Sequence, residues 1–195
     1  MKGVYVFLAD GFEDIEALSV TDVLRRGKID VKNVSISDSP YITSSHGVTV
    51  KADILLNELS LSADGTDSGD FLIFPGGMPG AVNLASCEIL MTAMRKHFAA
   101  GGSLAAICAA PGTVLSQLDS LKGVMFTCYD GFQGPAKEKG GIFTADPTDV
   151  FQSPHGSFIV TGRGAGYALE FALDILAAIS GEDNSDSVRE KMFLL

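Results

Sequence analysis

The sequence predicts an α/β protein built on a mostly parallel β-sheet. Residues 4–9 and 31–37 are short apolar runs typical of buried strands, and residues 14–26 between them carry apolar side chains at helical spacing. Gly11 and Gly27 separate the three segments. A strand, a helix and a second strand in this order form a right-handed crossover, so we expect the two strands to lie parallel.

The rest of the chain continues the alternation of strands and helices. We expect a hairpin over residues 41–51, a polar surface loop over 61–70 and a buried strand at 71–74. A helix containing Leu90, Met94 and Phe98 precedes the strand that ends at Cys108. The later expected elements are a helix from Ala109 to Leu118, strands at 124–128, 142–144, 149–152 and 157–161, a helix at 167–180 and a short helix through 188–192.

Composition favours one globular domain, residues 1–195, with 46% hydrophobic residues. There are 24 acidic residues against 14 lysines and arginines, and the net charge of −10 disfavours nucleic acid and anionic membranes as partners. Three cysteines without close pairing indicate a reducing compartment. The apolar N-terminal run is too short for a secretory signal, and no stretch approaches the roughly 20 apolar residues of a membrane helix, so we expect a cytoplasmic protein.

Cys108 lies between a strand of small residues and the helix expected after it. A thiol at such a turn faces the first free N–H groups of the helix, which lower its pKa and accommodate an oxyanion or an oxidised sulfur. The alternative is that Cys108 is a small buried apolar residue, as many free cysteines are.

Other candidate residues follow strands at the same edge of the sheet, where ligands collect in open parallel sheets. Gly76 and Gly77 follow the strand at 71–74, and their N–H groups could form an oxyanion hole. Glu16 lies in the first helix, where a partly desolvated carboxyl would keep its proton and donate a hydrogen bond to the sulfur. The alternative for Glu16 is an exposed position on the helix.

Five short motifs occur in an order and at spacings that resemble the ThiJ/PfpI superfamily, in the ThiJ/YajL-like branch that includes the parkinsonism-associated protein deglycase. They are DGFEDIE at 10–16, FPGG at 74–77, AICAAP at 106–111, TGRG at 161–164 and EFAL at 170–173. The resemblance implies a flavodoxin-like three-layer α/β/α sandwich, related to class I glutamine amidotransferases, that forms a homodimer. It also implies that Cys108 is the nucleophile, that Glu16 is its carboxyl partner and that Gly77 and Ala109 supply backbone donors.

The chain departs from the family pattern at two places. Ala109 stands where PfpI-type putative proteases have a histidine, so a Cys-His dyad of that kind is missing. Cys128 stands where the parkinsonism-associated relative has a histidine, which removes the usual base. The resemblance places His46 near the pocket and the dimer interface, and we include Cys128, Tyr129 and Arg163 as further pocket candidates.

The two remaining histidines are expected to have no catalytic role. His97 belongs on the surface of the helix that ends near Ala99, and His155 belongs in a hairpin turn.

These residues give three hypotheses of function. The first is an enzyme that needs neither metal nor organic cofactor and acts on reactive carbonyls, as a methylglyoxal glyoxalase or as a deglycase of protein or nucleotide adducts. The second is a redox-sensing chaperone or stress-response protein in which Cys108 is oxidised to a sulfinic acid. The third is a cysteine peptidase, which Ala109 disfavours because it replaces the required histidine.

Overall fold

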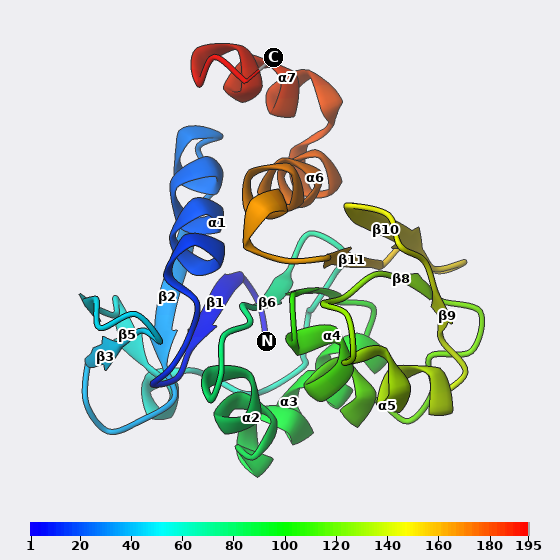
Figure 1. Cartoon of the computed structure of the whole chain (residues 1–195), viewed down its shortest axis with the longest axis horizontal. Helices are drawn as coiled ribbons and strands as arrows, with labels where there is room; N and C mark the ends of the chain where they lie inside the picture. The colour runs from blue at the N-terminus through cyan, green and yellow to red at the C-terminus, as the bar shows by residue number, and fades with distance from the viewer. Residues whose placement is uncertain (195) are drawn as a thin grey trace.

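The structure is a computed structural model that describes residues 1–194. A seven-stranded sheet forms the centre of the protein (Figure 1). Its strand order is β10-β11-β7-β6-β1-β2-β5, and every pairing is parallel except that of β10 with β11. The strands are β1 (Val4–Leu8), β2 (Val31–Ser35), β5 (Ile54–Leu55), β6 (Phe71–Phe74), β7 (Ser103–Ile107), β10 (Thr148–Gln152) and β11 (Phe158–Gly162). The prediction of a mostly parallel α/β sheet is confirmed.

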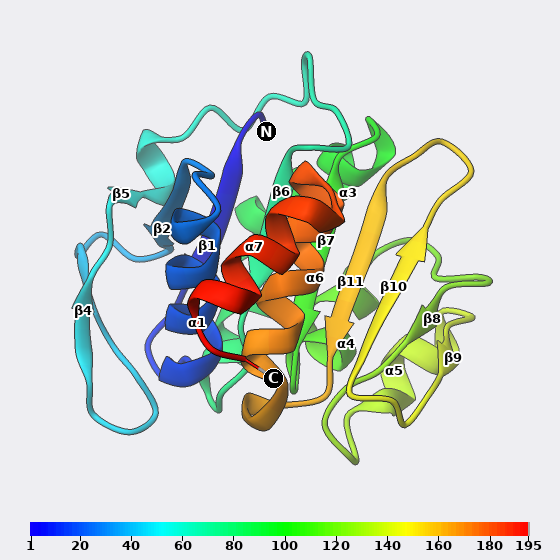
Figure 2. The same ribbon diagram turned by 90° about the horizontal axis from the view of Figure 1, so that it is seen from above.

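Helices cover both faces of the sheet, which gives the three layers that the resemblance implied (Figures 1 and 2). One face carries α1 (Asp14–Arg26), α6 (Ala168–Ser180) and α7 (Glu182–Lys191), and the other carries α2 (Gly80–Ala85), α3 (Glu88–Ala99), α4 (Ala110–Thr113) and α5 (Gln133–Glu138). No helix within residues 1–194 has the length and apolar character needed to cross a membrane.

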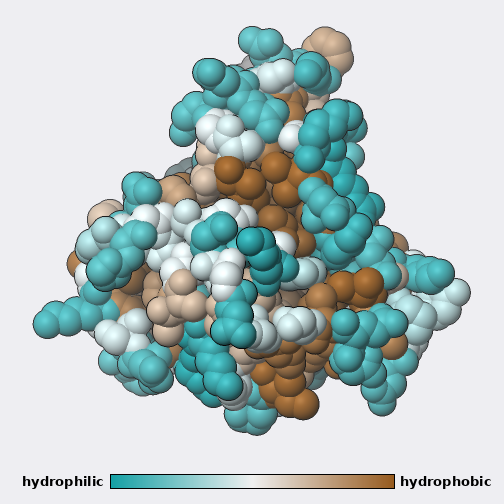
Figure 3. Space-filling view, turned by 180° about the vertical axis from the view of Figure 1, so that it is seen from behind, coloured by the Kyte–Doolittle hydropathy of each residue, from teal (hydrophilic) through white to brown (hydrophobic). Residues whose placement is uncertain are grey.

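The central strands are buried on both faces because their side chains alternate between two apolar cores. On β6, Phe71 and Ile73 pack under α1 and α6, whereas Leu72 and Phe74 pack toward α2 and α3. This alternation explains why the strands read as continuous apolar runs in the sequence. From behind, hydrophilic residues cover much of the surface, with several hydrophobic patches between them (Figure 3).

Two small sheets lie outside the central one. The expected hairpin is confirmed as β3 (Tyr41–Thr43) paired with β4 (Thr49–Lys51). The strands expected near 124–128 and 142–144 are short, and β8 (Met125–Phe126) pairs with β9 (Ile142–Phe143) apart from the main sheet.

The prediction of one continuous helix from Ala109 to Leu118 is wrong, because this segment is broken in two. It consists of the single turn α4 and a separate 3₁₀ turn at Leu115–Gln117. The Ala109 carbonyl accepts from both the N–H and the hydroxyl of Thr113, each at 3.1 Å, and the last helical bond runs from the Val114 N–H to the Ala110 carbonyl at 2.8 Å. Two further short 3₁₀ turns lie at Leu56–Glu58 and Ala165–Tyr167.

Candidate active site

Cys108 occupies a sharp turn between β7 and α4. Its backbone has φ of 62°, in the left-handed region that non-glycine residues rarely adopt and that often marks functional positions. The Cys108 N–H donates to the Gly162 carbonyl at 2.9 Å, and the Cys108 carbonyl accepts from the Tyr129 N–H at 2.8 Å. These bonds to two neighbouring segments fix the turn, and the side chain is half-buried at the carboxyl edge of the sheet.

Glu16 extends from the first turn of α1 toward this thiol. Glu13 caps the helix, its Oε2 accepting from the Glu16 N–H at 2.7 Å. The Glu16 side chain is completely buried, and its Oε2 accepts from the Gly76 N–H at 2.8 Å. Its Oε1 has no hydrogen-bond partner within residues 1–194, and the Cys108 thiol is the neighbouring group that interacts with the carboxyl. The alternative of an exposed Glu16 is therefore wrong.

Two glycines after β6 complete the surroundings of the sulfur. A Cβ on Gly76 would lie 2.6 Å from the Cys108 Cβ and 2.8 Å from the Glu16 Oε2, so only glycine fits there. Because the Gly76 N–H already donates to Glu16, the prediction of Gly76 as an oxyanion donor is wrong. The Gly77 and Ala109 N–H groups lie near enough to the sulfur to lower the pKa of Cys108, and their role as oxyanion donors stays a prediction.

The protonation of the two groups is linked. Burial, with a smaller contribution from the Glu13 charge, raises the pKa of Glu16 to about 7, against the opposing effect of the Gly76 N–H. Burial and the Glu16 carboxylate raise the pKa of Cys108 to about 12, although the Gly77 and Ala109 N–H groups act in the opposite direction. The expectation that the helix start gives a lowered thiol pKa is wrong, because burial and the Glu16 charge outweigh the backbone N–H groups.

It follows that the pair holds one proton just above neutral pH. These pKa values place that proton on the sulfur, and a thiolate arises when the proton moves from the sulfur to Glu16.

Tyr129 and Arg163 lie beside the turn and line a cavity of about 430 Å³. Its other lining residues are Asp130, Gly164, Ala165, Gly166 and Tyr167. The Arg163 guanidinium donates to both carboxylate oxygens of Asp130, at 2.9 and 3.1 Å. Cys128, in contrast, belongs to the apolar core, where burial and then the Asp130 charge raise the pKa of its thiol to about 11.

The structure corrects the position expected for His97. Its imidazole is completely buried, with Nδ1 at 3.0 Å from the Met1 carbonyl and Nε2 at 3.1 Å from the carbonyls of Asp70 and Ser103. Burial lowers the pKa of His97. Gly102 is the sequence feature that agrees with a buried His97, because a side chain at position 102 would collide with the imidazole.

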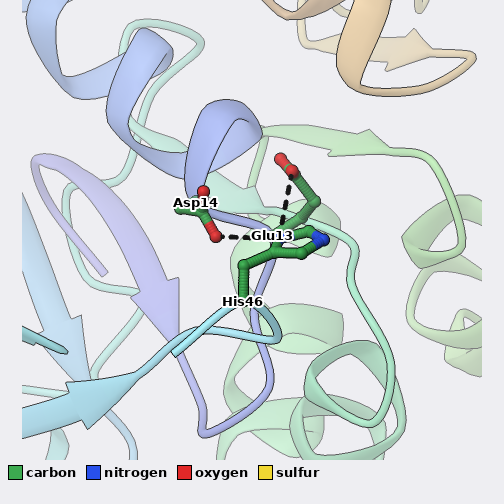
Figure 4. Close-up of side chains that lie close together, drawn as sticks. All are labelled: Glu13, Asp14 and His46. Atoms are coloured by element: carbon green, nitrogen blue, oxygen red, sulfur yellow. Dashed lines mark hydrogen bonds and ion pairs between the residues drawn. The ribbon is translucent and has the colours of Figure 1, made fainter. Parts of the chain in front are cut away.

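The other two histidines are near the surface. His155 lies in the turn between β10 and β11, as predicted. His46 lies in the β3–β4 turn, and its Nδ1 is 3.1 Å from Asp14 Oδ1 and 3.9 Å from Glu13 Oε1 (Figure 4).

The fold and the site place this chain in one class of proteins. These are flavodoxin-like, three-layer α/β proteins that carry a cysteine on a strand-to-helix turn with a buried carboxyl beside it. The chain belongs to the DJ-1/PfpI family, whose family model matches residues 2–178. This agrees with the ThiJ/PfpI resemblance carried by the five motifs.

Individual relatives match over nearly the whole chain. It is 30% identical over 193 residues to Protein dj-1beta of Drosophila melanogaster, covering 99% of this chain and 97% of the relative. It is 27% identical over 182 residues to the glutathione-independent glyoxalase DJR-1.2 of Caenorhabditis elegans, covering 93% and 90%. Protein DJ-1 homolog A of Arabidopsis thaliana is 32% identical over 194 residues, and this chain spans 47% of its length.

Solved structures agree with this assignment. Drosophila melanogaster DJ-1beta superposes with a TM-score of 0.85 at 27% identity, covering 100% of this chain and 98% of that one. The oxidised form of Toxoplasma gondii DJ-1 superposes with a TM-score of 0.83 at 29% identity, covering 99% and 98%.

Proposed function

We propose that this protein is a cysteine-dependent enzyme acting on reactive carbonyls, which converts methylglyoxal to lactate or removes methylglyoxal from its protein or nucleotide adducts. The observation that carries the proposal is the Cys108 thiol beside the buried Glu16 carboxyl, whose pKa of about 7 lets it take up and release a proton near neutral pH. The similarity to a relative named as a glutathione-independent glyoxalase supports the substrate class.

The reaction begins when the proton of the pair sits on Glu16 and the Cys108 sulfur is a thiolate. The sulfur attacks the aldehyde carbon of methylglyoxal, a carbon–sulfur bond forms, and the carbonyl electron pair moves to the oxygen. In this proposal the Gly77 and Ala109 N–H groups, which lie near the sulfur, turn to donate to the oxyanion once the sulfur has become neutral. Glu16 then gives its proton to the oxygen, which produces a hemithioacetal.

Lactate requires one internal proton transfer and one water molecule. The Glu16 carboxylate takes the proton from the former aldehyde carbon and returns it to the neighbouring ketone carbon through an enediol, which leaves a lactyl thioester. Water cleaves the thioester, releasing lactate and the thiol. With an aminocarbinol adduct, the sulfur attacks the carbinol carbon, the carbon–nitrogen bond breaks and Glu16 gives its proton to the departing amine. The same hemithioacetal results, so the products are free amine and lactate.

Glu16 has to act as the proton carrier because neither position that a family histidine would occupy supplies one. Ala109 follows the nucleophile, and Cys128 is a buried thiol whose pKa of about 11 keeps it neutral.

Lactate formation from methylglyoxal by the purified protein tests the proposal. We expect Cys108→Ala to abolish turnover and Cys87→Ala, a half-buried thiol at the start of α3, to retain it. Lactate formed by Cys108→Ala at the native rate would remove the sulfur from the mechanism.

The same surroundings favour a second candidate, a redox-sensing chaperone or stress-response protein. The Gly77 and Ala109 N–H groups and the Glu16 carboxyl could hold a sulfinate, and a similar structure is that of an oxidised DJ-1. Two successive oxygen transfers from peroxide, each releasing water, would oxidise the Cys108 thiolate to the sulfinate. Mass spectrometry after mild peroxide should then find two added oxygen atoms on Cys108, and an unmodified Cys108 would exclude this candidate.

We also propose that the chain forms a homodimer. Ile15 and Leu18 are exposed apolar residues on α1, with 54% and 37% of their surface accessible, and such residues favour an interface. Analytical ultracentrifugation should give twice the chain mass, and a monomer at micromolar concentration would contradict the proposal.

A further inference from the structure

We propose that Glu13, Asp14 and His46 form a binding site for a divalent transition-metal ion of the zinc type. One ligand atom from each residue, the His46 Nδ1 and one carboxylate oxygen from each acid, lies within 4.8 Å of the others. The ligands come from two segments, the start of α1 and the β3–β4 turn, that fold against each other (Figure 4). This site adjoins the Cys108–Glu16 pair, because the Glu13 charge contributes to the raised pKa of Glu16, but it uses a histidine that the proposed reaction does not need.

The backbone holds the two segments in a fixed relation. The Ser45 N–H donates to the Phe12 carbonyl at 2.8 Å, and the Gly11 N–H donates to the Thr43 carbonyl at 2.8 Å. The Ser44 hydroxyl accepts from the His46 N–H at 3.2 Å. The imidazole is therefore carried on a turn that is bonded directly to the loop before α1, so the site is organised before an ion arrives.

Glu13 supplies the second observation that points to a cation. Its side chain is 12% exposed, and its Oε2 is occupied as the acceptor for the Glu16 N–H. Its Oε1 forms a long ion pair with His46, 3.9 Å from Nδ1 and beyond hydrogen-bond range, so this oxygen remains available to a cation. The single proton that Nδ1 can carry is directed at Asp14, 3.1 Å away. A protonated His46 would therefore form a hydrogen bond with one carboxylate only. A divalent ion between the three groups would bind both carboxylates and the imidazole.

The donor set and its spacing select the type of ion. One imidazole nitrogen with two carboxylate oxygens suits zinc and its neighbours, whereas magnesium and calcium prefer oxygen alone. Zinc bonds of about 2.0–2.2 Å place tetrahedral ligands about 3.4 Å apart, between the 3.1 and 3.9 Å separations found here. The third separation, between the Glu13 and Asp14 oxygens, is at most 4.8 Å, so the side chains have to rotate to bind one ion. The His46 side chain is 64% exposed, so an ion and its fourth ligand, water, reach the site from solvent.

The test is a zinc chloride titration of the metal-free full chain, in competition with a chromophoric chelator. We expect His46→Ala and Asp14→Asn each to weaken Zn²⁺ binding by about tenfold or more, because each removes one of three ligands. His155→Ala, which removes a turn histidine elsewhere, is the matched control and should bind like the native chain. Glu13→Gln keeps an oxygen to cap α1 but loses the charge, and it should also weaken binding.

The Cys108 thiol is the competing zinc ligand, so the titration is repeated with Cys108→Ala. Unchanged affinity there, with loss in His46→Ala, supports the site. Equal Zn²⁺ affinity in the native chain and His46→Ala, or loss of binding in Cys108→Ala alone, would overturn it. With Co²⁺ as probe, a visible absorption band that disappears in His46→Ala gives a second, spectroscopic readout, and circular dichroism confirms that each variant is folded.

Discussion

Replacing Glu16 with glutamine separates the charge of this carboxyl from its packing. The amide oxygen of glutamine can still accept from the Gly76 N–H, which now donates to Oε2 at 2.8 Å. The amide nitrogen then takes the place of the unpartnered Oε1 and faces the Cys108 sulfur. Glutamine is neutral and has nearly the shape of protonated glutamic acid. The difference in stability between the variant and the native chain should therefore depend on pH.

The size of that effect follows from the shifted pKa. In the folded chain the pKa of Glu16 is about 7, against an ordinary value of 4.5, because the side chain is buried. The folded state therefore binds this proton more tightly than the unfolded state does. The stabilisation is complete below pH 4.5 and is lost as the pH rises through 7. A difference of about 2.5 pH units at 1.36 kcal/mol each corresponds to about 3 kcal/mol.

Urea unfolding at pH 5, 6, 7 and 8 measures this quantity as a difference between two proteins. The free energy of unfolding of Glu16→Gln, minus that of the native chain, should rise by about 2–3 kcal/mol from pH 5 to pH 8. Glu138→Gln, an exposed change on α5, should give a flat difference. A flat difference for Glu16→Gln as well would mean that Glu16 is ionised throughout, and it would refute the shared proton.

Two further substitutions test the site and its support. Gly76→Ala places a Cβ 2.6 Å from that of Cys108, so we expect lactate formation to fall about tenfold or more while the protein stays folded by circular dichroism; native turnover would show that the close approach is unimportant. His97→Ala removes a buried imidazole that lies between the Met1 amino group, 3.3 Å from Nδ1, and the Ser103 carbonyl, 3.1 Å from Nε2, and we expect urea unfolding to show a loss of about 2–4 kcal/mol. A loss below about 0.5 kcal/mol would contradict the bridging role of His97.

The sheet and the position of Cys108 could be predicted from the sequence because both depend on local patterns. Strands buried on both faces leave continuous apolar runs, and Cys108 stands at the junction of such a run with small helix-forming residues. Elements with weak local signals were missed: β5 has two residues, and α5 contains Gly134 and Pro135 in its six. The three layers and the carboxyl partner of the thiol were predicted by resemblance to a family.

The protonation of the site could not be predicted, because it depends on contacts between distant segments. The Gly76 N–H is 60 residues from Glu16 in sequence, and its bond to the carboxyl removes it as an oxyanion donor. Burial of Cys108 beside Glu16 reverses the pKa shift that a helix start alone would produce. His97 is buried by the N-terminus and the residues around Asp70, which no helical pattern reveals.

The central claim is that Cys108 and Glu16 share one proton near neutral pH, and the rate of Cys108 alkylation by iodoacetamide against pH tests it most directly. In the native chain we expect the rate to rise around pH 7, as Glu16 titrates, and then to reach a plateau. In Glu16→Gln the step near pH 7 should disappear and the rate should keep rising beyond pH 9, because burial still holds the pKa of the thiol above its ordinary value of 9.0. The same pH profile in both proteins would contradict the account.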